Sequence, residues 1–170
     1  KLSGRLAMLD YLKKRNIPTT ASATKIYSRD RNLWHISHEG GTIEDPANPP
    51  PDDAWMLTAD PAQAPDTAEN VTLGFERGRP ISLNGKRLKA WEIVEKLNGT
   101  AGAHGVGRVD LVENRRVGLK SRGLYETPGG TVIVEALRAL EELVLDRETR
   151  HYREHLGLTF AELVYDGRWF

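Results

Sequence analysis

The sequence has 170 residues and a mass of 19.0 kDa, enough for one domain and marginal for two; 39% of its residues are hydrophobic and 28% are charged. The 24 basic and 24 acidic residues cancel, so the charge gives no support for a generally cationic surface that binds nucleic acid. The absence of cysteine excludes disulfides and thiolate chemistry, and no apolar run approaches the ~18 residues of a membrane span, so we expect a cytoplasmic protein without a membrane segment.

The N-terminal half begins with a predicted helix and continues through a long polar region. Apolar residues at helical spacing predict a helix over residues 3–15, with Ser3 as a candidate N-cap. We expect a short strand near residues 25–27 and then a polar loop. Residues 46–65 hold six of the nine prolines, which predicts an extended surface excursion.

A three-stranded meander is predicted over residues 71–88. Apolar and polar residues alternate there in short runs, which is typical of half-buried strands. Asn84-Gly85 separates the last two runs, and this pair favours the tight turn of a β-hairpin because both residues tolerate a positive φ.

The C-terminal half is predicted to be mainly helical. A helix over residues 89–98 should end at Asn98-Gly99, and the glycine-rich residues 99–130 read as irregular. The widest apolar stripe predicts a helix over residues 131–145, with another helix beginning near Asp146.

The order of these elements predicts an α+β fold, with helices packed on a mostly antiparallel sheet in a single domain over residues 1–170. Trp169 and Phe170 end the chain. Two adjacent aromatic side chains are seldom left in water, so we expect them to be buried in this domain or against a part that is missing.

A first polar stretch covers residues 27–41. It holds hydroxyl, carboxylate, amide and imidazole groups within fifteen residues. A purely structural interpretation makes Ser28 a helix cap, Asn32 a turn residue and Gly40-Gly41 a flexible exit.

The same stretch raises the hypothesis of a metal site at His35, His38 and Glu39. The pattern lacks a further ligand at a recognisable spacing. We therefore expect no metal ion, and a solvated or hydrogen-bonded pair of histidines instead.

A second polar stretch covers residues 104–130. Between Arg108 and Arg122 it has five basic and two acidic residues, which fits a solvated loop face, a patch that attracts phosphate, or an interface with another chain. Gly105-Val106-Gly107 is a fragment of a phosphate-loop pattern, but no complete pattern is present. No nucleophile elbow or spaced carboxylate pair identifies a catalytic residue, so the residues alone indicate two polar clusters able to hold a small zwitterionic ligand.

At these two stretches the chain resembles argininosuccinate synthase of the bacterial type. The resemblance extends in order over essentially all 170 residues, although the family's nucleotide-binding domain and its C-terminal oligomerisation arm are not part of it. The motifs that carry it are Tyr27-Ser28-x-Asp30-x-Asn32-Leu33-x-His35-Ile36-Ser37-x-Glu39-Gly40-Gly41, His104-Gly105-Val106-Gly107-Arg108-Val109-Asp110-x-Val112-Glu113-Asn114-Arg115 and Lys120-Ser121-Arg122-Gly123-x-Tyr125-Glu126-Thr127-Pro128-Gly129-Gly130.

The resemblance implies the synthetase domain of an enzyme of arginine biosynthesis. That enzyme ligates L-citrulline and L-aspartate through a citrullyl-adenylate, with ATP and Mg²⁺ bound mainly by the nucleotide-binding domain, and it forms a homotetramer. The present chain, which corresponds to the synthetase domain alone, is then expected to be inactive by itself. Two alternatives remain: a stand-alone non-catalytic module that binds a ligand or a partner, and a basic-loop module that binds nucleic acid or a partner protein.

By its motifs, the resemblance implies that Ser28, Ser37, Glu113 and Tyr125 contact citrulline. Hydroxyl groups can donate to the polar groups of the ligand, and the carboxylate of Glu113 can pair with its ammonium group. The structural alternatives are an ion pair between Glu113 and a basic neighbour such as Arg115, and a place for Tyr125 in the core.

Overall fold

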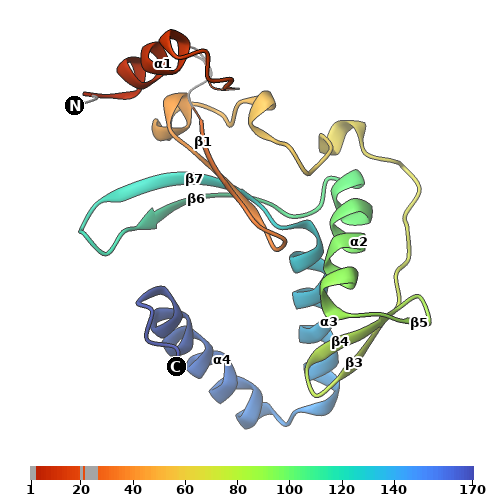
Figure 1. The fold of residues 1–170 in the computed structure, drawn as a ribbon. Helices are drawn as coiled ribbons and strands as arrows, with labels where there is room; N and C mark the ends of the chain where they lie inside the picture. Colours follow the sequence, from red (N-terminus) through yellow and green to blue (C-terminus); the bar gives the residue numbers. More distant parts are fainter. Residues whose placement is uncertain (1–2, 20, 22–26) are drawn as a thin grey trace.

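The computed structural model of the chain describes residues 3–19, 21 and 27–170 (Figure 1). Within these residues it has four α-helices and two antiparallel sheets, so the predicted α+β class is confirmed. The helices are α1 (Arg5–Lys14), α2 (Ala90–Ala103), α3 (Pro128–Val144) and α4 (Arg147–Tyr165), and the strands are β1 (Ser28–Arg31), β2 (Ile36–Glu39), β3 (Leu73–Glu76), β4 (Arg79–Leu83), β5 (Lys86–Arg87), β6 (Arg108–Asn114) and β7 (Lys120–Glu126).

The larger sheet has the order β1-β2-β7-β6, so two hairpins far apart in the sequence meet at β2 and β7. The turn of the first hairpin is closed by Asn32, whose Oδ1 accepts the backbone N–H of Trp34 at 2.8 Å and that of His35 at 2.9 Å, which confirms the predicted turn. Ser28 begins a strand, so its prediction as a helix cap was wrong. The strand expected near residues 25–27 lies mostly outside the described residues.

The second hairpin, β6–β7, corrects the prediction that residues 99–130 are irregular. All seven residues of each strand are paired, from Arg108 opposite Glu126 to Asn114 opposite Lys120. The alternation was hidden because β6 is an edge strand that carries polar side chains on both faces.

The smaller sheet, β3-β4-β5, is the predicted meander. Asn84 and Gly85 form its turn with φ of 49° and 77°, as the hairpin requires. This sheet packs against α2 and α3, which lie side by side (Figure 1). The shared core holds the buried residues Ile93, Val94, Leu97 and Ile133, with Val71, Leu73, Phe75, Leu83, Leu88 and Val132 packed against them.

Helix α2 continues to Ala103, so the predicted stop at Asn98-Gly99 was wrong. The Asn98 side chain is engaged in tertiary contacts instead of a cap: Nδ2 donates to the Leu33 carbonyl at 2.8 Å and Oδ1 accepts Gly129 N–H at 2.9 Å. Helix α3 likewise begins earlier than predicted, at Pro128, which suits a first helical turn because proline has no N–H to satisfy.

The proline-rich excursion covers one face of the larger sheet. It includes short 3₁₀ turns at Asp52–Ala54 and Pro61–Gln63, and a third such turn, Gly41–Glu44, lies just before it. Ala54 from the excursion and Ile43 from the turn before it form a second core with Leu124 of β7. The excursion is therefore a structural layer that contributes buried side chains.

The terminal helices lie at the periphery of the molecule (Figure 1). Gly4 occupies the N-cap of α1 without a side-chain hydrogen bond, so Ser3 is not the cap. Trp169 and Phe170 stack edge to face on each other but are 63% and 96% exposed, so they are not buried within the described part of the chain. None of the helices described is both long and apolar enough to span a bilayer.

Candidate functional site

The register of the larger sheet places all four residues named by the resemblance on one face. Ser37 lies directly opposite Tyr125 in the β2–β7 pair. Ser28 lies opposite Glu39, two residues beyond Ser37, and Glu113 is four residues along β6 from the partner of Tyr125. Because side chains alternate between faces with a period of two, these positions share the face that we call the ligand face.

Tyr125 and Glu113 are in contact on this face. The Tyr125 hydroxyl donates to Glu113 Oε1 over 3.3 Å, and burial together with the Glu113 charge raises the pKa of the phenol. The phenol therefore stays protonated near neutral pH and remains a donor.

Gly123 leaves the space that the tyrosine ring occupies. A Cβ at this position would lie 2.8 Å from Tyr125 Cε2 and 3.2 Å from the hydroxyl oxygen. The ring thus lies over the glycine, which brings its hydroxyl within reach of β6.

The serines differ in accessibility. Ser28 is exposed on the edge strand β1, whereas Ser37 is only 6% exposed. Ser37 lies between Asp30 and Tyr125 in the sheet, so its hydroxyl is at the centre of the ligand face.

Arg115 adds a cation beside these groups. Its Nη2 donates to Glu39 Oε2 and lies 3.7 Å from Glu113 Oε1. The predicted alternative of an Arg115–Glu113 ion pair is therefore present only as the longer of two contacts. One guanidinium and two carboxylates leave this corner with a net negative charge, which favours an ammonium group.

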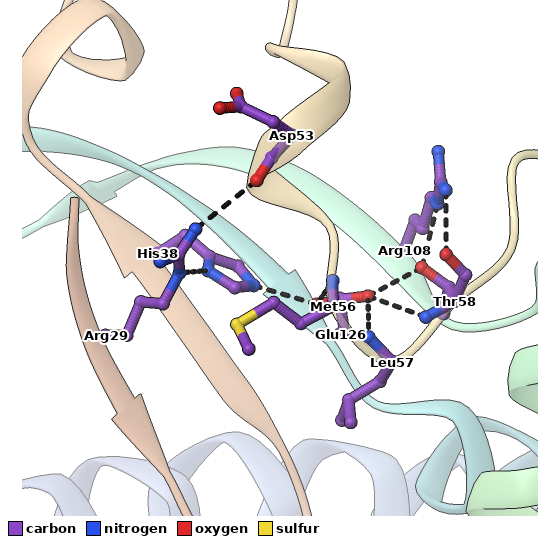
Figure 2. Close-up of polar contacts among 8 residues, drawn as sticks. All are labelled: Arg29, His38, Asp53, Met56, Leu57, Thr58, Arg108 and Glu126. Carbon is purple, nitrogen blue, oxygen red and sulfur yellow. Dashed lines mark hydrogen bonds and ion pairs between the residues drawn. The ribbon is translucent and has the colours of Figure 1, made fainter. Parts of the chain in front are cut away.

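The opposite face of the same sheet holds a buried carboxylate, Glu126 (Figure 2). Its two oxygens accept five hydrogen bonds of 2.7–2.8 Å from His38 Nε2, the backbone N–H groups of Met56, Leu57 and Thr58, and the Thr58 hydroxyl. Burial alone would raise the pKa of Glu126, but the hydrogen bonds outweigh it and lower the pKa to about 2.

His38 is fixed by its two neighbours. Arg29 Nε donates to its Nδ1 at 3.2 Å, and arginine carries no acceptor, so Nδ1 must be unprotonated. The proton is then on Nε2, which donates to Glu126 at 2.8 Å. His38 is therefore a neutral, fully buried imidazole, in line with the expected hydrogen-bonded histidine.

The metal hypothesis has no support in the geometry. No group of three or more histidine, aspartate or glutamate side chains is placed to hold a metal ion in the part of the chain that the structure describes. His38 faces the core, while Glu39 lies on the ligand face with Arg115.

The basic residues of the second polar stretch all have partners within the chain. Arg122 is buried and makes a two-pronged ion pair with Asp110 at 2.7 and 2.8 Å. Arg108 donates to the Thr58 hydroxyl and lies 4.5 Å from the Trp55 ring centre. The other basic residues also have partners: Arg115 with Glu39, Arg116 with Asp166, and Lys120 with Asn114.

Sequence reasoning missed the buried network around Glu126 and Arg122. Both residues lie inside the motifs quoted above, but the loop groups that they bond are 68–79 positions away, in the proline-rich excursion and in the segment just before it. No local spacing could reveal these pairs. The available signal was the alternation along β7, in which Arg122 and Glu126 lie on the same face of the strand as the apolar Leu124.

The fold and this face define an α+β domain whose antiparallel sheet presents hydroxyl and carboxylate groups on one side and buries an ionised carboxylate on the other. The family model described as "Arginosuccinate synthase C-terminal domain" matches residues 27–170. The chain therefore belongs to the argininosuccinate synthase C-terminal domain family.

Curated proteins named argininosuccinate synthase are similar along the whole chain. The protein of Erwinia tasmaniensis is 59% identical over 169 residues, and that of Serratia proteamaculans is 58% identical over 169 residues; each match covers 99% of this chain. The protein of Shewanella piezotolerans is 58% identical over 170 residues, or 100% of the chain. The chain spans 42% of the length of each of these relatives.

Proposed function

We propose that the chain supplies one half of the citrulline site of an argininosuccinate synthase, through Ser28, Ser37, Glu113 and Tyr125. The observation that carries this proposal is the register that brings all four to the ligand face, with Tyr125 bonded to Glu113. Hydroxyl groups and one net negative charge suit a zwitterionic amino acid with a polar ureido end.

In this proposal the reaction ligates L-citrulline to L-aspartate at the expense of ATP. The ureido oxygen attacks the α-phosphorus and releases pyrophosphate; the aspartate amine then attacks the ureido carbon and releases AMP. Glu113 would hold the citrulline ammonium while Tyr125 and the serines orient the rest of the molecule. Their contribution is positioning, which lowers the entropic part of the barrier.

ATP and Mg²⁺ would be bound mainly by the part of the longer protein that lies outside this chain. The described residues lack a metal-binding cluster, and the sequence lacks a complete phosphate-loop motif. We therefore expect that the isolated chain does not ligate or hydrolyse ATP, and that the full-length protein acts as a cytoplasmic homotetramer.

In the full-length protein, Glu113→Gln should raise the Michaelis constant for citrulline by about 10- to 150-fold, because a charge-assisted contact of ~1.5–3 kcal/mol is lost. Steady-state kinetics with citrulline as the varied substrate measure this. Glu135→Gln, on the exposed side of α3, is the matched control and should behave as wild type. An unchanged constant for Glu113→Gln would refute the proposed site.

A further inference from the structure

The carboxylate of Glu113 can bind the ammonium group of a ligand only if it is not already in a close ion pair with Arg115. The two residues are two positions apart on the same side of the chain, and the guanidinium already lies 3.7 Å from Glu113 Oε1. A closer, two-pronged approach would use both carboxylate oxygens, as arginine and carboxylate geometries match.

A second carboxylate, Glu39, competes for the same guanidinium. Arg115 Nη2 makes its shorter contact with Glu39 Oε2, and the hydrogen bond to Glu39 is the main cause that raises the pKa of Arg115, ahead of the Glu113 charge. Among the described residues, both contacts of Glu113 fall on Oε1, from Arg115 and from Tyr125. Oε2 therefore keeps its lone pairs for a further donor.

The position of Arg115 depends on this pairing more than on close packing. Its side chain is 39% exposed, and it lines a cavity of about 410 Å³ at the point where β2 ends and β7 begins. Glu39 lines the same cavity and is itself 29% exposed. The guanidinium thus has room to turn toward Glu113 when Glu39 no longer holds it.

From this geometry we propose that Glu39 is a positioning residue for citrulline: it draws Arg115 aside and so keeps Glu113 available for the α-ammonium group. The inference rests on the proposed citrulline site and adds a residue that acts through Arg115 and Glu113. Arg115 in turn keeps the two carboxylates from repelling each other, so the trio holds one net negative charge for the ligand.

The test is Glu39→Gln in the full-length protein. Arg115 should turn onto Glu113, and the Michaelis constant for citrulline should rise about 5- to 20-fold with kcat within about twofold of wild type, because a charge-assisted contact is blocked. In the double variant Glu39→Gln/Arg115→Met the competing cation is absent, so the constant should return to within about threefold of wild type. Glu44→Gln, on the rim of the same cavity, is the control.

A second ligand separates this effect from general damage. 5-Ureidopentanoate lacks the α-ammonium group, so its inhibition constant should be the same in wild type and in Glu39→Gln. Circular dichroism and thermal unfolding confirm that each variant is folded.

The possible results are distinct. An unchanged citrulline constant in Glu39→Gln, or a double variant that fails to recover, overturns the inference while leaving the proposed site intact. If Glu113→Gln also leaves the constant unchanged, the proposed site is refuted and the inference falls with it.

Discussion

At the scale of the residue, the ionisation of Glu126 links stability to pH. Its pKa is about 2 in the folded chain and 4.5 in the unfolded reference, so the unfolded state binds more protons between these values. The stabilisation is complete above about pH 5 and is lost as pH falls toward 2. A difference of this size corresponds to about 3 kcal/mol.

We therefore predict that Glu126→Gln lowers the free energy of unfolding at pH 7 by about 3 kcal/mol or more. The amide nitrogen of glutamine is a donor, and it would face N–H groups that now donate hydrogen bonds to the carboxylate. Urea denaturation at pH 7 and at pH 3 measures the effect. The loss of stability between pH 7 and pH 3 should be smaller in the variant than in the wild type. Part of the loss that remains in the variant comes from Asp110, whose pKa is lowered chiefly by its hydrogen bonds from Arg122. Equal acid sensitivity in both proteins would contradict the assignment.

Gly123 offers a test of the ligand face that depends on shape instead of charge. In Gly123→Ala the new methyl group must displace the Tyr125 ring. The atoms that it meets are at the far end of the tyrosine side chain, which can move, so the cost in stability should be about 1 kcal/mol. The citrulline constant of the full-length protein should rise about fivefold as the tyrosine hydroxyl leaves its place. Gly99→Ala meets open space in α2 and should leave the citrulline constant unchanged.

At the scale of the element, one side chain joins three segments. Asn98 of α2 bonds the β1–β2 turn through Leu33 and the first turn of α3 through Gly129. Asn98→Ala should cost about 2 kcal/mol because it leaves both backbone groups without this partner. Asn98→Asp retains the acceptor for Gly129 N–H and loses the donor, so it should cost about half as much. Thermal unfolding of the three proteins gives the order, and equal stability would exclude the bridge.

The sequence predicts an element well when neighbouring residues determine its structure, and poorly when distant residues do. The meander was predictable because Asn84-Gly85 specifies its turn locally. The β6–β7 hairpin was not, because its edge strand is polar on both sides and its inner strand bonds a distant loop. The four ligand-face residues came from the resemblance, and only strand register shows that Ser28 and Tyr125 share a face.

At the scale of the whole molecule, α4 presents an apolar stripe with nothing packed closely on it in the described structure. Tyr152, Leu156, Phe160 and Val164 recur at a spacing of four and are all exposed. The helix is tied to the rest by ion pairs, including Arg153 to Glu141 at 2.8 Å and Arg116 to Asp166 at 2.6 Å. Such a stripe favours association with another apolar surface.

The isolated chain should therefore self-associate. Sedimentation at increasing concentration is expected to show species larger than 19.0 kDa, and Phe160→Glu should shift them toward the monomer, because a charge would enter the contact. His151→Glu, on the polar side of α4, is the matched control. A wild-type chain that remains monomeric at all concentrations would contradict the prediction.

Adjacent residues of β7 serve the two faces of the sheet, since Tyr125 lies on the ligand face and Glu126 bonds the loop at Met56–Thr58. A slip of one position would exchange a phenol for an ionised carboxylate on each side at once, and neither side tolerates the exchange. The strand thus has a single permissible alignment, because the hydrogen bonds of Glu126 on one face also fix the position of the Tyr125 hydroxyl on the other. We therefore expect substitutions in the loop at Met56–Thr58, which bonds Glu126, to move the Tyr125 hydroxyl as well.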